Sequence, residues 1–169
     1  MDGKGDFLSA FDNPASYFAE LLRALGSEHV DPRLDRDVAT NKGGEFWIVY
    51  PKGTYFEHFA GEIRRVAQLE DVPSLFKAIV LLVLLGGYHP YLDFNGRLSR
   101  VFFSISLSHF TGRRVFVPLK DAAILSRGNF LISARHAHFY DEWEPIFVYF
   151  HKLFAHVVAR HEIRSNAPG

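Results

Sequence analysis

The chain has 169 residues, 48% hydrophobic and 22% charged, which is enough apolar sequence for one domain with a core of its own. The formal net charge is zero, so the composition provides no overall attraction to nucleic acid or to an anionic membrane surface. The absence of cysteine excludes disulfide scaffolds, cysteine nucleophiles and thiolate metal sites.

The N-terminal residues are polar, and no apolar run of the kind found in a signal peptide follows them. The longest apolar run, at residues 79–85, is too short to span a bilayer. We therefore expect a soluble, cytoplasmic protein that binds neither nucleic acid nor membranes. The sequence leaves open secretion, as an effector, by a route that uses no cleaved signal.

The first predicted helix begins at Asn13 and Pro14 and ends at Gly26. Residues 27–44 are polar and contain proline and paired glycines, which predicts a loop. Aromatic and β-branched residues then indicate a small β-hairpin, with strands at 46–50 and 54–56 around a Pro-Lys-Gly turn.

Three strong helices are predicted next: from about 56–58 to 69, from 71 to 85, and from 95 to 110. For the second, Asp71 is the candidate N-cap, and the helix is apolar on every side, as in the middle of a bundle. For the third, Gly112 is the predicted stop.

Residues 120–137 and 142–163 have the pattern of two further helices. The fold class predicted is all-α, a helical bundle with one small β-hairpin. We expect a single domain over residues 1–169, with an N-terminal helix and loop at 1–44, a hairpin at 45–56 and a helical core at 57–163.

The segment at 89–100 connects the two most apolar helices, and its residues are His-Pro-Tyr-Leu-Asp-Phe-Asn-Gly-Arg-Leu-Ser-Arg. Gly86 and Gly87 are expected to end one helix, and Pro90 prevents its continuation. A short loop then leads into the next helix at about Asn95. Tyr91 and Leu92 are interpreted as apolar anchors of this loop.

A helix start exposes unpaired N–H groups and the positive end of the helix dipole. Arg97 and Arg100 are three residues apart in what we take to be the first turn, on one face of the helix. Each cation there costs about 0.3–1 kcal/mol, so two of them indicate a bound anion. Gly96 lets an anion approach the backbone closely. The segment therefore predicts a phosphate-binding loop.

Two neighbouring side chains add chemistry to that loop. Asp93 provides a hard oxygen ligand of the kind that holds Mg²⁺ against phosphates. His89 titrates near neutral pH and is the candidate general base.

These residues resemble the signature of the Fic family (Fic/Doc proteins), in which a histidine is followed by an acidic residue, Asn, Gly or Lys, and two arginines at fixed spacing. The matching residues are His89, Asp93, Asn95, Gly96, Arg97 and Arg100. Tyr91 stands where the family usually has Phe, and Phe94 where it has Gly or Ala. The order of predicted elements is similar to the family's over roughly residues 45–155.

The resemblance implies a protein adenylyltransferase, which transfers AMP from ATP to a Ser, Thr or Tyr hydroxyl of a target protein. It implies His89 as the base, Asp93 as the Mg²⁺ ligand and Arg100 as the γ-phosphate ligand. Asn95, Gly96 and Arg97 would cradle the phosphates. The hairpin, as a flap, would bind an extended segment of the target by strand addition.

Phe94 leaves two alternatives open, a transferase that uses another donor such as UTP and an inactive Fic-fold interaction module. In many Fic proteins the glutamate of an inhibitory helix pairs with the second arginine. Ser16 and Glu20 have that helix's spacing, but Leu21 follows, and Tyr17 and Phe18 have the pattern of core residues. The sequence leaves room for a separate inhibitory or antitoxin protein.

Overall fold

The computed structural model describes residues 7, 12–27, 39–40, 48–50 and 56–165. The chain divides into two compact units, Met1–Val117 and Pro118–Gly169, and the segment at 89–100 belongs to the first. The described residues are mainly helical, which confirms the all-α class. None of the helices in this part of the chain is both long and apolar enough to cross a membrane.

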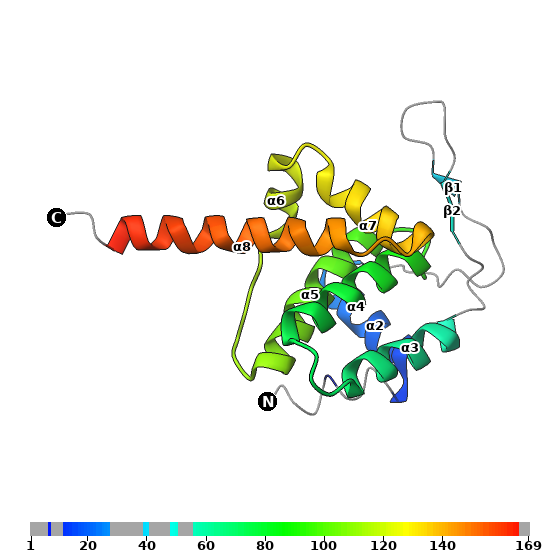
Figure 1. Ribbon diagram of the computed structural model, residues 1–169. Helices are drawn as coiled ribbons and strands as arrows, with labels where there is room; N and C mark the ends of the chain where they lie inside the picture. The colour runs from blue at the N-terminus through cyan, green and yellow to red at the C-terminus, as the bar shows by residue number, and fades with distance from the viewer. Residues whose placement is uncertain (1–6, 8–11, 28–38, 41–47, 51–55, 166–169) are drawn as a thin grey trace. The chain divides into compact units, whose positions relative to one another are not determined.

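The first unit contains four helices within its described residues: α2 (Pro14–Ala24), α3 (Phe56–Gln68), α4 (Ser74–Tyr88) and α5 (Asn95–Thr111) (Figure 1). Helix α2 begins as predicted, because the Asn13 side-chain oxygen accepts a hydrogen bond from the Ser16 N–H at 3.1 Å. Helix α5 ends as predicted, at Gly112 in the left-handed conformation.

Helix α4 begins and ends three residues later than predicted. Asp71 does not cap it, since the helix starts at Ser74 and Asp71 has a left-handed backbone with φ 58°. Gly86 and Gly87 lie inside the helix, which continues to Tyr88. A glycine inside a helix costs only about 1 kcal/mol relative to alanine, so two glycines before a strong stop do not end it. The stop is His89, in the left-handed conformation.

Helices α4 and α5 pack against each other in antiparallel fashion. At one end the Ser74 hydroxyl donates to the Phe110 carbonyl at 3.1 Å, and the Lys77 ammonium lies over the Phe110 ring at 5.5 Å. The core of this unit is apolar and largely aromatic, and Phe7, Phe18, Phe59, Leu81, Leu85, Leu98 and Phe102 are among its buried members. This core carries the loop that joins the two helices.

The strand pairing differs from the predicted hairpin. Strand β2 (Ile48–Val49) confirms a strand within 46–50, but it pairs with β1 (Ala39–Thr40), in a segment predicted to be a loop. The register is antiparallel, with Ala39 opposite Val49 and Thr40 opposite Ile48. The predicted second strand cannot include Phe56, which begins α3, and residues 51–55 lie outside the described part.

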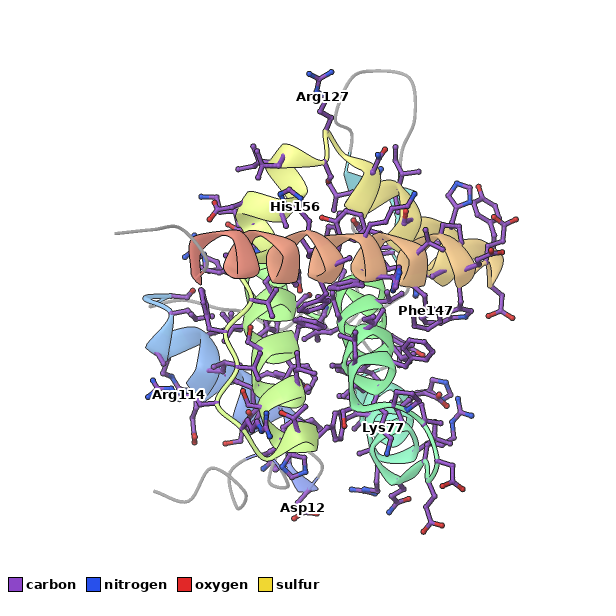
Figure 2. All side chains as sticks on the ribbon, turned by 60° about the vertical axis from the view of Figure 1, so that its left-hand side comes forward. Asp12, Lys77, Arg114, Arg127, Phe147 and His156 are labelled. Atoms are coloured by element: carbon purple, nitrogen blue, oxygen red, sulfur yellow. The ribbon has the colours of Figure 1, made fainter. Side chains whose placement is uncertain are left out.

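The second unit contains α6 (Leu119–Leu125), α7 (Asn129–Tyr140) and α8 (Glu144–Ser165). The single helix predicted at 120–137 is two helices, because Gly128 takes a left-handed backbone with φ 93° between them. Arg127 lies at this turn and points away from both helices (Figure 2). Helices α7 and α8 pack through aromatic rings, with the centroids of Phe130 and Tyr149 5.6 Å apart.

Candidate functional site

The loop between α4 and α5 is closed by the side chain of Asn95. Its amide oxygen accepts the Tyr91 N–H at 3.0 Å, and its amide nitrogen donates to the Tyr91 carbonyl at 2.6 Å. The Asn95 side chain is 2% exposed, so both bonds are shielded from water. In this structure the Asn95 side chain therefore braces the loop, and what it offers to a ligand is its backbone N–H.

Tyr91 anchors the loop as predicted. Only 2% of this residue is exposed, and burial raises the pKa of its hydroxyl to about 12, so the phenol stays neutral at physiological pH. Leu92 was predicted to be a second anchor, and this is wrong, because Leu92 is 46% exposed. One buried ring and the Asn95 amide hold the loop without it.

Phe94 is the residue before α5 and has a left-handed backbone, with φ 66° and ψ −4°. For a bulky residue this conformation costs about 1–2 kcal/mol, which the surrounding structure must offset. Its ring packs against the apolar core, and the Arg97 guanidinium lies over the ring at 4.3 Å from the centroid. This contact is a cation–π interaction that fixes the direction of Arg97.

The start of α5 is uncapped. Among the described residues no side chain accepts a hydrogen bond from its first turn, and that turn contains no acidic residue. Among the described residues the N–H groups of Asn95 and Gly96 have no hydrogen-bond acceptor. Gly96 is exposed, and a Cβ atom there would lie 3.3 Å from a terminal nitrogen of Arg100. The Arg100 guanidinium therefore reaches back over Gly96 toward the helix start.

The two arginines form a cationic pair next to that start. Arg97 is in the first turn and exposed, whereas Arg100, also predicted in the first turn, is in the second and half-buried. Within the part of the chain that the structure describes, neither has a carboxylate partner, in contrast to Arg65, which pairs with Glu62 at 2.6 Å. Burial and then the charge of Arg97 lower the pKa of Arg100 from its ordinary value. Two adjacent cations at positive N–H groups favour a bound anion.

Asp93 lies beside this site and is exposed. One of its carboxylate oxygens accepts the Phe94 N–H at 2.6 Å, and the other has no hydrogen bond among the described residues. No group of three or more potential metal-ligating side chains occurs in that part of the chain. Mg²⁺ commonly binds through one or two carboxylates together with water and phosphate oxygens, so the donor present here fits Mg²⁺ carried by a nucleotide.

His89 lies at the end of α4, with a half-buried side chain and a left-handed backbone of φ 50°. Its Nδ1 atom is 3.4 Å from the Gly86 carbonyl oxygen. The ring of Tyr50, the residue that follows β2, is stacked on the imidazole with centroids 3.9 Å apart and planes 17° apart. Sequence reasoning missed Tyr50, because nothing in the sequence relates a residue after a strand to the histidine 39 positions later.

The structure therefore brings the predicted site residues together on one loop and one helix start, where the Asn95 side chain is bonded to Tyr91. The helix weighed as an inhibitory element packs as a core helix, with Phe18 buried and Tyr17 against the core, as its pattern predicts. Glu20 is exposed, and one of its carboxylate oxygens lies 3.5 Å from the Ser16 hydroxyl.

Sequence comparison assigns no family to this site. No protein-family model matches the chain, and no curated protein matches it. What the site does must follow from its own residues and their geometry.

Proposed function

We propose that this chain is a Fic-type protein adenylyltransferase, which transfers AMP from ATP to a Ser, Thr or Tyr hydroxyl of a target protein. The observation that carries the proposal is the uncapped start of α5, where Arg97 and Arg100 have no carboxylate partner among the described residues. Next to it lie a histidine and an exposed aspartate.

The helix start would bind the phosphates of the nucleotide. The N–H groups of Asn95 and Gly96 lie at the positive end of the helix dipole, where phosphate oxygens bind well. Arg97 would neutralise charge on the inner phosphates, and Arg100 the terminal phosphate. Each charge-assisted hydrogen bond of this kind contributes about 1.5–3 kcal/mol.

Asp93 would hold the magnesium ion of the nucleotide through its second carboxylate oxygen. When bound, the ion would neutralise the phosphate charge that develops as pyrophosphate leaves. The hydrogen bond from the Phe94 N–H to the first oxygen orients the carboxylate before any ligand arrives. Asp93 is thus preorganised by its own loop.

His89 would act as the general base. Its Nε2 atom would take the proton from the target hydroxyl as the hydroxyl oxygen attacks the α-phosphate. A new O–P bond forms, the bond between the α-phosphorus and the bridging oxygen breaks, and pyrophosphate leaves with that electron pair. AMP stays on the target, and a neutral histidine supplies the general-base step at physiological pH.

The flap would bind the target. In the β1–β2 pair, two residues of each strand are paired, and a paired strand with one open edge can accept an extended segment by main-chain hydrogen bonds. Such binding tolerates varied side chains and would bring a hydroxyl toward His89, since Tyr50 links the end of β2 to that histidine.

The experiment is label transfer in a cell lysate containing Mg²⁺, with ATP, UTP, GTP or CTP labelled at the α-phosphate. The variant is His89→Ala, and the matched control is His136→Ala, which removes a histidine that pairs with Glu142 at 2.7 Å in the second unit. We expect labelled protein bands from ATP with the wild type and the control, and none with His89→Ala.

Other outcomes would redirect the proposal. Bands from UTP alone would retain the transferase and change the donor, with Phe94 as the residue that reshapes the phosphate loop. No histidine-dependent band from any donor would contradict the proposed activity and favour an interaction module that uses the same loop for binding.

A further inference from the structure

We propose that Tyr50 is a positioning residue for His89, and that it couples the orientation of this base to strand β2. The inference rests on the proposed function, because it assigns a role to Tyr50 in the same proton transfer. It is carried by the ring stack between the two residues.

The contact is a face-to-face stack. The centroids lie 3.9 Å apart with the planes 17° apart. Another Tyr–His neighbour pair in the chain has a different geometry, since the rings of His136 and Tyr140 are 5.6 Å apart and inclined at 59°. The Tyr50 ring therefore covers one face of the His89 imidazole, which the Tyr140 ring does not do for His136.

The stack restricts rotation of the His89 imidazole, and a general base needs a fixed orientation. The second side-chain torsion of histidine is broad and roughly two-fold, so an unsupported imidazole exchanges its two nitrogen positions. The Tyr50 ring against one face hinders rotation of the imidazole out of its present plane, and exchange of the two nitrogens requires that rotation. The Nδ1 atom then faces the Gly86 carbonyl at 3.4 Å, where an N–H is the group that can donate. The lone pair is thereby left on Nε2, the atom that takes the proton.

The same ring face favours the charged product of the transfer. Once Nε2 has taken the proton, His89 is a cation lying against the π-face of tyrosine, and aromatic faces attract cations. The Tyr50 hydroxyl has no part in either effect. Phenylalanine at position 50 should therefore serve as well as tyrosine, whereas an aliphatic side chain should not.

The position of Tyr50 gives the stack its link to the target. Tyr50 directly follows Val49, whose backbone is paired opposite Ala39 in the strand ladder. A segment that adds to this strand pair or shifts its register moves the first residue after β2. The orientation of the base then depends on whether β2 holds its ladder position, so occupation of the flap and readiness of His89 are coupled.

The test compares Tyr50→Phe, Tyr50→Leu and the control Tyr140→Leu in the full chain. One measurement is NMR of protein labelled with ¹⁵N-histidine, which reports the tautomer of His89 from its two ring nitrogens without any need for activity. The second is lysate label transfer over a series of ATP concentrations, which gives the maximal rate and the half-saturating ATP concentration.

We expect Tyr50→Phe and Tyr140→Leu to keep the Nδ1–H tautomer of His89 and a rate within about twofold of wild type. Tyr50→Leu should show mixed tautomers and lose about tenfold or more of the maximal rate, with the half-saturating ATP concentration unchanged. A single unchanged tautomer in Tyr50→Leu would overturn the inference, as would an equal loss in Tyr50→Phe. If the wild type transfers nothing, the proposed function fails, while the tautomer measurement still decides the role of Tyr50.

Discussion

The two ends of helix α5 have nearly the same flanking backbone and opposite chemistry. Gly112 at the C-terminal end has φ 65°, and Phe94 at the N-terminal end has φ 66°. At the C-terminal end glycine takes this conformation without strain, its N–H donates to the His109 carbonyl, and the Thr111 hydroxyl donates to the Leu107 carbonyl at 2.7 Å. The C-terminal end is therefore unstrained and well hydrogen-bonded.

The N-terminal end lacks these stabilising features. A bulky residue occupies the left-handed position, no side chain in the described part of the chain caps the first turn, and Arg97 places a positive charge at the positive end of the dipole. Packing of the Phe94 ring on the core can offset its backbone strain, but it does not account for the missing cap or for the position of Arg97. Local departures from stability are often tolerated where a protein binds or reacts, so this end of the helix is where the proposed site is expected.

The largest expected effect concerns His89, the proposed general base. His89→Ala should lower the transfer rate by about 10²-fold or more, because general-base catalysis contributes this much. His89→Ala should change the free energy of unfolding by less than Asn95→Ala does. Retention of more than a tenth of the wild-type rate would contradict the assignment of the base.

The next effect concerns the brace of the loop. Asn95→Ala leaves the buried N–H and carbonyl of Tyr91 without their partners, and should lower the free energy of unfolding by about 2–3 kcal/mol. Chemical denaturation measures this value. Asn129→Ala, at the exposed first position of α7, is the control and should cost far less. Similar losses in both variants would show that the Asn95 amide is not a brace.

Positions 94 and 112 test the backbone comparison itself. At each position the glycine form should be more stable than the alanine form by about 1 kcal/mol, since both backbones are left-handed. The variants are Phe94→Gly and Phe94→Ala at one end, and wild type and Gly112→Ala at the other. An alanine at position 94 that equals or exceeds glycine in thermal stability would show that Phe94 is unstrained.

The smallest expected effect is on the free energy of unfolding, and it compares two arginines. Arg100 has no carboxylate partner among the described residues, whereas Arg65 pairs with Glu62. Arg100→Gln removes a half-buried cation that lies beside Arg97, so we expect no loss of stability and a gain of about 0.3 kcal/mol. Arg65→Gln breaks the ion pair with Glu62 and should lose about 0.3 kcal/mol. Denaturation curves measured in parallel should therefore shift in opposite directions, and equal losses would indicate a structural role for Arg100.

The sequence predicted local features well and pairing poorly. Helix positions follow from apolar spacing and from caps such as Asn13 and Gly112, and the loop at 89–100 follows from Pro90 and the charges around it. These signals lie within a few residues of what they specify. The glycines at 86 and 87 misled the prediction, because the helix continues through them and ends only at His89, the residue before Pro90.

Contacts between distant segments were not accessible in this way. The partner of β2 lies in a polar stretch around Ala39, where two residues of strand carry no pattern. The stack of Tyr50 on His89 depends on how the strand pair lies against the end of α4, which no periodicity encodes. The bend at Gly128 divided the helix predicted at 120–137, although residues 126–129, Ser-Arg-Gly-Asn, are a local turn signal that the prediction did not use.

The central claim is that the start of α5 binds the phosphates of a nucleotide, and calorimetric titration with Mg²⁺–ATP tests it most directly. We predict that the wild type binds, that His89→Ala binds with similar affinity, and that Arg97→Gln and Arg100→Gln each bind at least about tenfold more weakly, the loss expected for a charge-assisted contact. Absence of binding by the wild type, or equal binding by both arginine variants, would contradict the claim.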